Sequence, residues 1–224
     1  MKRIIFLLVI ICVILYFQYP HINETNNTFE ILQFNNPNKS IFENMLNEKK
    51  IAIFTSIPID LEFNGILPEY FTKDFTNTLQ NNKEFKKILN ENLEYYKIPL
   101  CIKNKTYFSY FDNKNSKLIY QNNYRFMIIN LKNTIKITLF NPDQKDNLYF
   151  DKNNKSSIDF YNSDYEKFPK LNDVKYIEVL LHKDQMICIP FKWIYILNKY
   201  EEQDTILLSY INESIFSKLL KKIN

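Results

Sequence analysis

A series of short apolar segments in the second half of the chain restricts the folds available to it. The clearest is NTIKITLF, residues 133–140, where Ile135, Ile137 and Leu139 alternate with polar residues. Alternation with period two places one face of a strand in the core and the other towards solvent, as in an antiparallel sheet. Further strand candidates are TYFSYF (106–111), YRFMIIN (124–130), KYIEVLL (175–181), MICIP (186–190), WIYIL (193–197) and TILLSYI (205–211). Short strands at this spacing predict a small barrel or jelly roll.

The segments on either side of these strands favour helices. Ser40 is a candidate N-cap for the following IFENMLNEKK, and residues 68–98 have the pattern of two amphipathic helices. Between them, KIAIFTSI (50–57) is a strand candidate. At the other end, ESIFSKLLKKI (213–223) is typical of an amphipathic helix with lysines in its last turn. We therefore expect an α+β class: a barrel with a helical N-terminal region.

The N-terminus has the features of a membrane signal. Residues 4–17 form an unbroken apolar run behind Lys2 and Arg3. The sequence after the run has aromatic residues suited to the membrane interface and no small residues for signal-peptidase cleavage, which favours an uncleaved signal anchor over a cleaved signal peptide. We expect one transmembrane helix within residues 1–20, in contact with the membrane through residues 4–19.

The basic residues before the run predict a single-pass topology, with the N-terminus in the cytosol and the domain in a lumen or outside the cell. Six N-x-S/T sequons are compatible with this topology. Residues 21–40 are polar and asparagine-rich, and they predict a linker to a domain spanning residues 41–224. Within that domain we expect the barrel core at about residues 101–212 and the closing helix at 213–223.

Composition narrows the classes of partner. The 29 basic residues include Lys2 and Arg3, so the rest of the chain carries 27 against 25 acidic residues and predicts no nucleic-acid partner. The single glycine, Gly65, excludes phosphate-binding loops and the usual dinucleotide-binding fold. The three cysteines form no C-x-x-C pair, although a Cys101–Cys188 bridge stays open for an oxidising compartment.

Three blocks of sequence carry a family resemblance. ITLFNPDQKDNLYF, SSIDFYNSDYEKFPKLNDVKYIEVLL and MICIPFKWIYIL occur in order between about residues 117 and 211. They resemble the core of the cupin-like JmjC group, and in particular the factor-inhibiting-HIF type asparaginyl hydroxylases. The resemblance implies a double-stranded β-helix, which is a cupin or jelly-roll-like barrel. The motif positions to which it assigns structural roles are Pro142, Asp159, Phe168, Pro169, Pro190 and Trp193.

Active members of that group hold Fe(II) with an H-x-D/E…H triad and use 2-oxoglutarate and oxygen. In this chain the resemblance places the triad positions on Tyr120, Asn122 and Tyr195, and the lysine that binds 2-oxoglutarate on Ile135. A phenol near neutral pH and a neutral amide are poor Fe(II) ligands, and the neighbouring Lys136 points to the other face of its strand. The resemblance therefore implies no catalytic residue, no metal site and no cofactor.

The resemblance also indicates which residues replace glycine at the family's tight turns. The glycines that the family uses before the cosubstrate lysine and in the turn before the IP strand fall on Asn133 and Asp184. Asparagine and aspartate tolerate left-handed backbone angles better than most other residues. We therefore expect tight turns at these two positions.

Two functions remain open. The first is a membrane-anchored cupin-like domain that has lost Fe(II)/2-oxoglutarate catalysis and serves as a binding or structural module for an unknown protein or small molecule. The alternative is a divergent Fe(II)/2-oxoglutarate-dependent protein hydroxylase with ligands such as Asp112, Asp143 or Tyr120. The anchor, the AT-rich codon bias and the IP-x-x-W-x-Y ending also resemble membrane-anchored cupin-like proteins of large nucleocytoplasmic DNA viruses, which implies a virion membrane as a further location.

Overall fold

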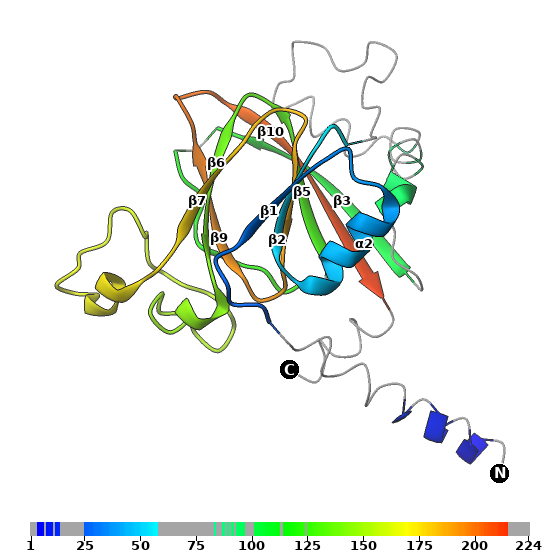
Figure 1. The fold of residues 1–224 in the computed structure, drawn as a ribbon. Helices are drawn as coiled ribbons and strands as arrows, with labels where there is room; N and C mark the ends of the chain where they lie inside the picture. Colours follow the sequence, from blue (N-terminus) through cyan, green and yellow to red (C-terminus); the bar gives the residue numbers. More distant parts are fainter. Residues whose placement is uncertain are drawn as a thin grey trace.

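The structure is a computed structural model that describes residues 25–57, 93–96, 101–112, 114–123 and 125–214, with single residues or short pieces of 4–13 and 83–91. The described residues form two β-sheets that face each other (Figure 1). One sheet has the order β1 (Ile31–Asn35), β2 (Ile51–Thr55), β8 (Met186–Ile189), β5 (Arg125–Lys132), β10 (Thr205–Ser214) and β3 (Cys101–Phe111). The other has the order β4 (Ile119–Tyr120), β9 (Ile194–Lys199), β6 (Ile135–Phe140) and β7 (Ile177–Leu181). Every strand predicted from the sequence is present.

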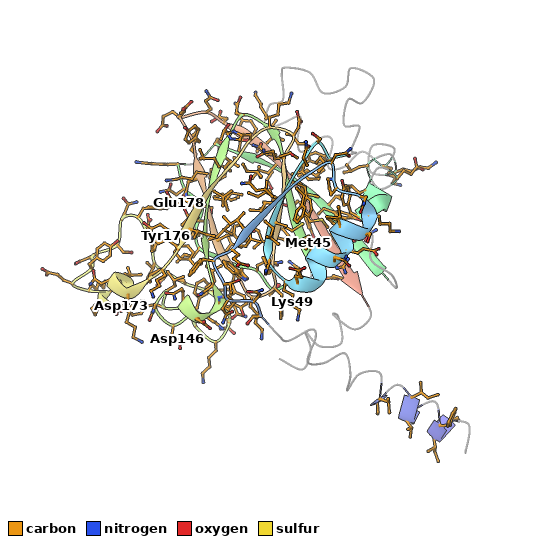
Figure 2. All side chains as sticks on the ribbon, viewed as in Figure 1. Met45, Lys49, Asp146, Asp173, Tyr176 and Glu178 are labelled. Atoms are coloured by element: carbon orange, nitrogen blue, oxygen red, sulfur yellow. The ribbon has the colours of Figure 1, made fainter. Side chains whose placement is uncertain are left out.

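The space between the sheets is filled by apolar side chains. The alternation predicted for β6 is correct, because Ile135, Ile137 and Leu139 are all fully buried there. They pack with inward residues from β2, β5, β7, β8, β9 and β10. Figure 2 shows side chains filling the space between the two sheets.

The outer faces of both sheets are also covered. The helix α2 (Lys39–Glu48) and the 3₁₀ turn η1 (Leu93–Tyr96) pack on the outer face of the β1–β3 sheet through Phe42 and Tyr96, whose rings are 4.7 Å apart. The segment from Leu148 to Leu171 covers the outer face of the other sheet around Phe140. This segment includes part of the connection between β6 and β7, which contains η2 (Pro142–Gln144) and η3 (Pro169–Asp173).

This cover corrects the expectation that the polar face of β6 is solvated. Thr138 is fully buried beneath this segment. Its hydroxyl is satisfied there, because it bonds to the Tyr161 hydroxyl (2.5 Å) and accepts a hydrogen bond from Asn198 Nδ2 (2.8 Å). The amide of Asn198 also donates to the Tyr161 hydroxyl (2.8 Å). These three side chains hold the connecting segment against the sheet.

The expected linker over residues 21–40 is wrong in its second half. Residues 31–35 form β1, which pairs in parallel with β2 at the edge of the sheet, and α2 connects the two strands. The helix begins at Lys39 and is capped by Asn38, whose Oδ1 accepts from Ile41 N (2.8 Å), so the predicted cap at Ser40 is wrong by two residues. The N-terminal region therefore contributes two strands to the barrel, which begins well before residue 101. Most of the two helices predicted within residues 68–98 lies outside the described residues.

The end of the barrel also differs from expectation. β10 continues to Ser214 with a register shift at Glu213, so the closing helix does not begin at residue 213. The rest of the predicted helix lies outside the described residues. Cys188 is a buried free thiol on β8, and Cys101 lies three strands away on β3. Three strand spacings amount to about 14 Å, which is too far for a disulfide, so a Cys101–Cys188 bridge is excluded.

Tight turns in this glycine-poor chain are made by other residues. Asn133 (φ 57°) and Asp184 (φ 62°) adopt the left-handed conformation, as predicted. Lys49, Lys192, Glu201 and Glu202 do the same although they are less suited to it. Nowhere in the described part of the chain is there a helix with both the length and the apolarity to span a bilayer.

Candidate functional site

Two of the predicted site positions lie in the core between the sheets but at different levels, because Tyr195 pairs with Leu139, four residues along β6 from Ile135. Tyr195 on β9 is almost fully buried in the core between the sheets and stacks on Phe126 of β5, with ring centroids 5.7 Å apart. Ile135 on β6 belongs to the same cluster and is fully buried. Burial raises the pKa of the Tyr195 phenol, so the side chain is neutral at physiological pH.

Tyr120 does not join them. It packs on the outer side of the β4–β7 sheet, where its ring lies 5.9 Å from that of Phe150 and Lys145 Nζ lies 4.9 Å above it. The strand register explains this placement. Ile119 pairs with Tyr195 and packs against the inner core, so the next residue along β4 must face outwards.

The residue after Tyr120 faces inwards again. Gln121 is buried, and its Nε2 donates to the backbone oxygens of Asn123 (2.8 Å) and Ile189 (3.3 Å). Its Oε1 accepts from Asn123 N (2.7 Å), so the amide holds the turn after β4 against β8. Asn122 is exposed. The resemblance placed the first two triad positions on Tyr120 and Asn122. The strand register differs by one residue, because Ile119 and Gln121 are the residues that face inwards.

These residues do not fit an Fe(II) or 2-oxoglutarate site. The inward positions are an aliphatic side chain, an amide whose polar atoms are in use, and a neutral buried phenol. Ile135 carries no charge, and Lys199, which lies opposite it on β9, already pairs with Asp204 (2.7 Å), so neither supplies a free cation for a buried carboxylate. Within the described residues, no three or more His, Cys, Asp or Glu side chains come together as a metal site.

The alternative ligands lie elsewhere. Asp143 is exposed in η2, where its carboxylate accepts a hydrogen bond from Asn27 Nδ2 (2.7 Å). Asp112 is exposed after the end of β3. Neither carboxylate belongs to the inner core with Tyr195.

The motif residues of the sequence have structural roles. Trp193 is fully buried, and its Nε1 donates to the backbone oxygen of Asn26 (3.0 Å) while Phe29 packs edge-on against its ring. The Asp159 carboxylate accepts from Tyr161 N (3.2 Å) and Asn162 Nδ2 (2.8 Å). The others are Pro142 and Pro169, which begin η2 and η3, Phe168, which packs on Tyr149 with ring centroids 5.2 Å apart, and Pro190, which is buried after β8.

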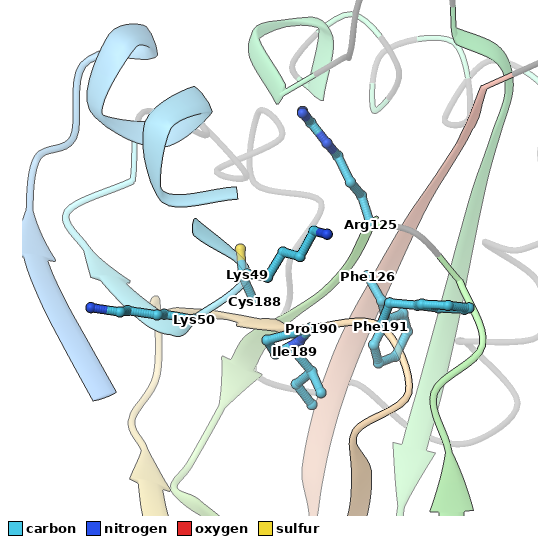
Figure 3. A pocket seen from close by; sticks show the side chains of 8 residues that line it. All are labelled: Lys49, Lys50, Arg125, Phe126, Cys188, Ile189, Pro190 and Phe191. Carbon is cyan, nitrogen blue, oxygen red and sulfur yellow. The ribbon is translucent and has the colours of Figure 1, made fainter. Parts of the chain in front are cut away.

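A pocket lies at the rim of the larger sheet, where β5 begins and β8 ends (Figure 3). Its enclosed volume is only about 20 Å³, which is room for about one water molecule. The sequence pattern did not indicate this pocket. Arg125, the only arginine beyond residue 3, is the feature of the sequence that could have drawn attention to it. The lining combines basic and apolar residues: Lys49, Lys50, Arg125, Phe126, Cys188, Ile189, Pro190 and Phe191.

Comparison with known proteins identifies a family. The sequence profile described as "cupin-like domain" matches residues 72–211, which is more than half of the chain. A search of curated proteins gives no match.

Solved structures give only remote likenesses. They include the cupin domain of Drosophila melanogaster CENP-C (7% identity, TM-score 0.30, 50% of this chain and 61% of that one). Oxalate decarboxylase of Bacillus subtilis is 7% identical with a TM-score of 0.32, over 56% of this chain and 24% of that one. Vicilin of Solanum melongena is 8% identical with a TM-score of 0.33, over 57% of this chain and 26% of that one. The chain covers less than two thirds of each of these proteins, and the assignment rests on the family profile alone.

Proposed function

Because this chain belongs to the cupin-like domain family, we propose that it is a member without Fe(II)- and 2-oxoglutarate-dependent catalysis, and that it acts as a binding or structural module. The observation that carries this proposal is the filling of the barrel interior. Ile119, Ile135 and Tyr195 occupy the inner core, where a 2-oxoglutarate oxygenase of this type would need imidazoles, a carboxylate and a cation.

An anaerobic Fe(II) titration of the purified protein in the presence of 2-oxoglutarate tests the proposal. We expect no stoichiometric binding at micromolar affinity in this titration, and no protein-dependent succinate release in a separate assay with oxygen present. The His182→Ala variant is a control, because His182 is an exposed imidazole that could bind iron weakly from solution. Stoichiometric binding that persists in this variant would contradict the proposal.

The divergent hydroxylase is the weaker candidate. It requires Asp112, Asp143 or Tyr120 to reach one iron, but Tyr120 packs on the outer face of the sheet and Asp143 bonds to Asn27. Succinate release that is abolished by Asp143→Asn would favour it over the non-catalytic module.

The second part of our proposal is that the module is held at a membrane by the apolar run at residues 4–17, with the barrel on the lumenal or extracellular side or on a virion membrane. The likeness to membrane-anchored viral cupin-like proteins supports this arrangement. Alkaline extraction of membranes tests the anchor: the full chain should stay with the membrane, and a chain without residues 1–20 should be released. Release of both chains would contradict anchoring.

The side of the membrane has its own test. Asn38 is exposed within an N-x-S sequon, so a barrel in the secretory lumen should carry a glycan there that Asn38→Gln removes. A full chain without any glycan after passage through that lumen would contradict the lumenal side.

A further inference from the structure

The segment before β1 meets η2 at one end of the barrel, outside the inner core where the family's iron would lie (Figure 1). Two hydrogen bonds join the segment to η2. Asn27 Nδ2 donates to Asp143 Oδ1 (2.7 Å), and Asn141 Nδ2 donates to the backbone oxygen of Asn27 (3.1 Å). Two amide side chains and one carboxylate therefore gather around Asn27.

Each of the two amides has an oxygen that is buried without a hydrogen bond. Asn27 Oδ1 and Asn141 Oδ1 are both inaccessible to solvent, and neither accepts from any donor in the part of the chain that the structure describes. The Asn141 residue as a whole is more than nine-tenths buried. Buried acceptors of this kind are costly, and in native proteins they mark the place of a bound water or ion.

The orientation of each amide is fixed by the bond that its nitrogen makes. Turning the Asn27 amide over would place its oxygen against the Asp143 carboxylate, and turning the Asn141 amide over would place two oxygens in contact. Either change would replace an attraction by a repulsion. The two unpaired atoms are therefore oxygens, and a donor or a cation is what satisfies them.

The charge of the third group favours a cation. Asp143 is exposed, and within the described residues its carboxylate forms no ion pair. The nearest lysine in the sequence, Lys145, has its Nζ above the Tyr120 ring at 4.9 Å. The end of the barrel around Asn27 thus offers neutral and anionic oxygens without a paired positive charge.

The chemistry of these groups selects the class of ion. Asn27, Asn141 and Asp143 present only oxygens, with no imidazole or thiolate for a transition metal. Calcium binds carboxylate and amide oxygens in irregular arrangements and accepts waters as further ligands, whereas magnesium demands a near-ideal octahedron. A search for His, Cys, Asp and Glu clusters does not find such a site, because two of its three groups are amides.

We propose that Asn27 Oδ1, Asn141 Oδ1 and the Asp143 carboxylate bind one Ca²⁺ ion, with waters completing its coordination. Because the site has a single carboxylate, we expect a dissociation constant of about 10⁻⁴–10⁻³ M, as in extracellular calcium modules. The ion fastens the segment before β1 to η2. This inference goes beyond the proposed function and depends neither on the loss of iron catalysis nor on the membrane anchor.

Thermal unfolding of the full chain in a neutral detergent tests the choice of ion. With about 10 mM Ca²⁺ we expect the Tm to rise by about 3–5 °C, since the folded state alone holds the site. Mg²⁺ and NaCl at matched ionic strength should each change it by less than about 1 °C. An unchanged Tm with Ca²⁺ would overturn the proposal, because water alone would then satisfy the amides. An equal rise with Mg²⁺ or NaCl would overturn it too.

Terbium(III) luminescence locates the ion. Terbium replaces calcium at oxygen sites and emits when a nearby tryptophan transfers energy to it. Trp193 is the only tryptophan of the chain, and its Nε1 donates to the backbone oxygen of Asn26, the neighbour of Asn27. We expect terbium emission on excitation of the indole, and a loss of that emission when Ca²⁺ is added. Absence of emission, or emission that Ca²⁺ does not reduce, would contradict a site at Asn27.

A pair of matched variants tests the carboxylate. Asp143→Asn keeps the shape of the side chain and removes its charge, so it should weaken terbium binding at least about fivefold and remove the rise in Tm. Asp173→Asn, which neutralises another exposed carboxylate in a 3₁₀ turn, should leave both unchanged. Equal effects of the two variants would contradict the assignment.

A third variant keeps the proposal testable if Asp143→Asn does not fold. Asn27→Asp places a second carboxylate beside Asp143, so it should lower the Tm in a chelator and bind Ca²⁺ about tenfold more tightly than the parent chain. A calcium affinity equal to that of the parent would overturn the proposal.

Discussion

At the scale of single residues, Asn130 connects three segments at one end of the barrel. It is fully buried on β5, and its Nδ2 donates to the backbone oxygens of Asn133 (2.6 Å) and Leu181 (2.7 Å). Its Oδ1 accepts from Thr205 Oγ1 (2.9 Å) and Lys132 N (3.2 Å). One amide thus joins the β5–β6 turn to the end of β7 and the start of β10.

We predict that Asn130→Ala lowers the free energy of unfolding by about 3 kcal/mol or more, because several buried groups lose their partners together. Urea unfolding measures the change. The matched control is Asn172→Ala, which removes an exposed amide with one bond to Pro169 and should cost less than about 0.5 kcal/mol. Similar losses in the two variants would contradict the role assigned to Asn130.

Asp204 makes stability depend on acid. Its carboxylate pairs with Lys199 Nζ (2.7 Å) and accepts a hydrogen bond from the Tyr110 hydroxyl (2.7 Å). The hydrogen bond from Lys199, followed by that from Tyr110, holds the pKa of Asp204 below its ordinary value of 3.8. A depressed folded-state pKa adds stability that is present above the unfolded-state pKa and is lost as the pH falls through the folded-state pKa.

We therefore predict that Asp204→Asn reduces stability at pH 7, and that its deficit relative to the parent chain shrinks as the pH falls below about 4. Thermal unfolding at a series of pH values measures the difference. Asp173→Asn, at an exposed carboxylate in η3, is the control and should give a curve parallel to that of the parent. A deficit in Asp204→Asn that stays constant down to pH 2 would contradict the linkage.

Predictions from sequence succeeded for residues whose environment depends on nearest neighbours. Ile135 was assigned an inward position from the alternation of its own strand. Asn133 and Asp184 were assigned tight turns because the family resemblance implies glycine there and both residue types tolerate left-handed angles. Tyr120 was assigned to the triad from the spacing of the family's motifs, and that spacing crosses the turns on both sides of β5, where a shift of one residue leaves no local sign. In a strand an error of one residue reverses the face, and only the pairing of Ile119 with Tyr195 reveals it.

At the scale of elements, the connection between β9 and β10 is a two-residue hairpin with unfavourable residues. Tyr200 pairs with Gln203, and the central Glu201 (φ 50°) and Glu202 (φ 55°) both have positive φ. Two central residues with positive φ define a type I′ turn, for which Asn-Gly is the preferred sequence. Glutamate at these positions strains the backbone.

We predict that the double substitution Glu201→Asn and Glu202→Gly raises the free energy of unfolding by about 1 kcal/mol. Chemical unfolding measures the gain. The control is Glu201→Gln with Glu202→Gln, which removes the same charges and leaves the backbone strain in place. A gain of equal size in the control would show that charge, and not turn geometry, is responsible.

Elements at the ends of the fold were the hardest to predict. β1 is a five-residue edge strand surrounded by asparagine, so the polar composition of its flanks outweighed the apolar residues of ILQFN. Its identity depends on parallel pairing with β2, a contact that crosses α2 and has no local signal. At the other end, Glu213 and Ser214 read as the start of a helix, yet β10 is extended there by its pairing with β3.

At the scale of the whole molecule, the segment before β1 closes one end of the barrel. Asn26 accepts from the Trp193 indole, Phe29 packs on its ring, and the Asn27 backbone oxygen accepts from Asn141 Nδ2 (3.1 Å). Trp193 is the only tryptophan of the chain, so its fluorescence reports on this closure directly.

We predict that removal of residues 1–30 shifts the emission of Trp193 to longer wavelength and lowers stability by several kcal/mol, because a fully buried indole becomes accessible to water. Steady-state fluorescence and thermal unfolding measure both effects. Removal of residues 1–20 alone is the control and should leave the emission unchanged. An unchanged spectrum after the longer truncation would contradict the closure.

The contact between Asn26 and Trp193 also limits how far the barrel can stand from the bilayer. A free linker over residues 21–40 would allow about 70 Å of extended chain, whereas fixing Asn26 leaves six residues and about 20 Å. Under the anchored arrangement that we propose, the barrel end around Trp193 faces the lipid headgroups at close range. The domain then samples a shallow layer at the membrane surface with a restricted orientation.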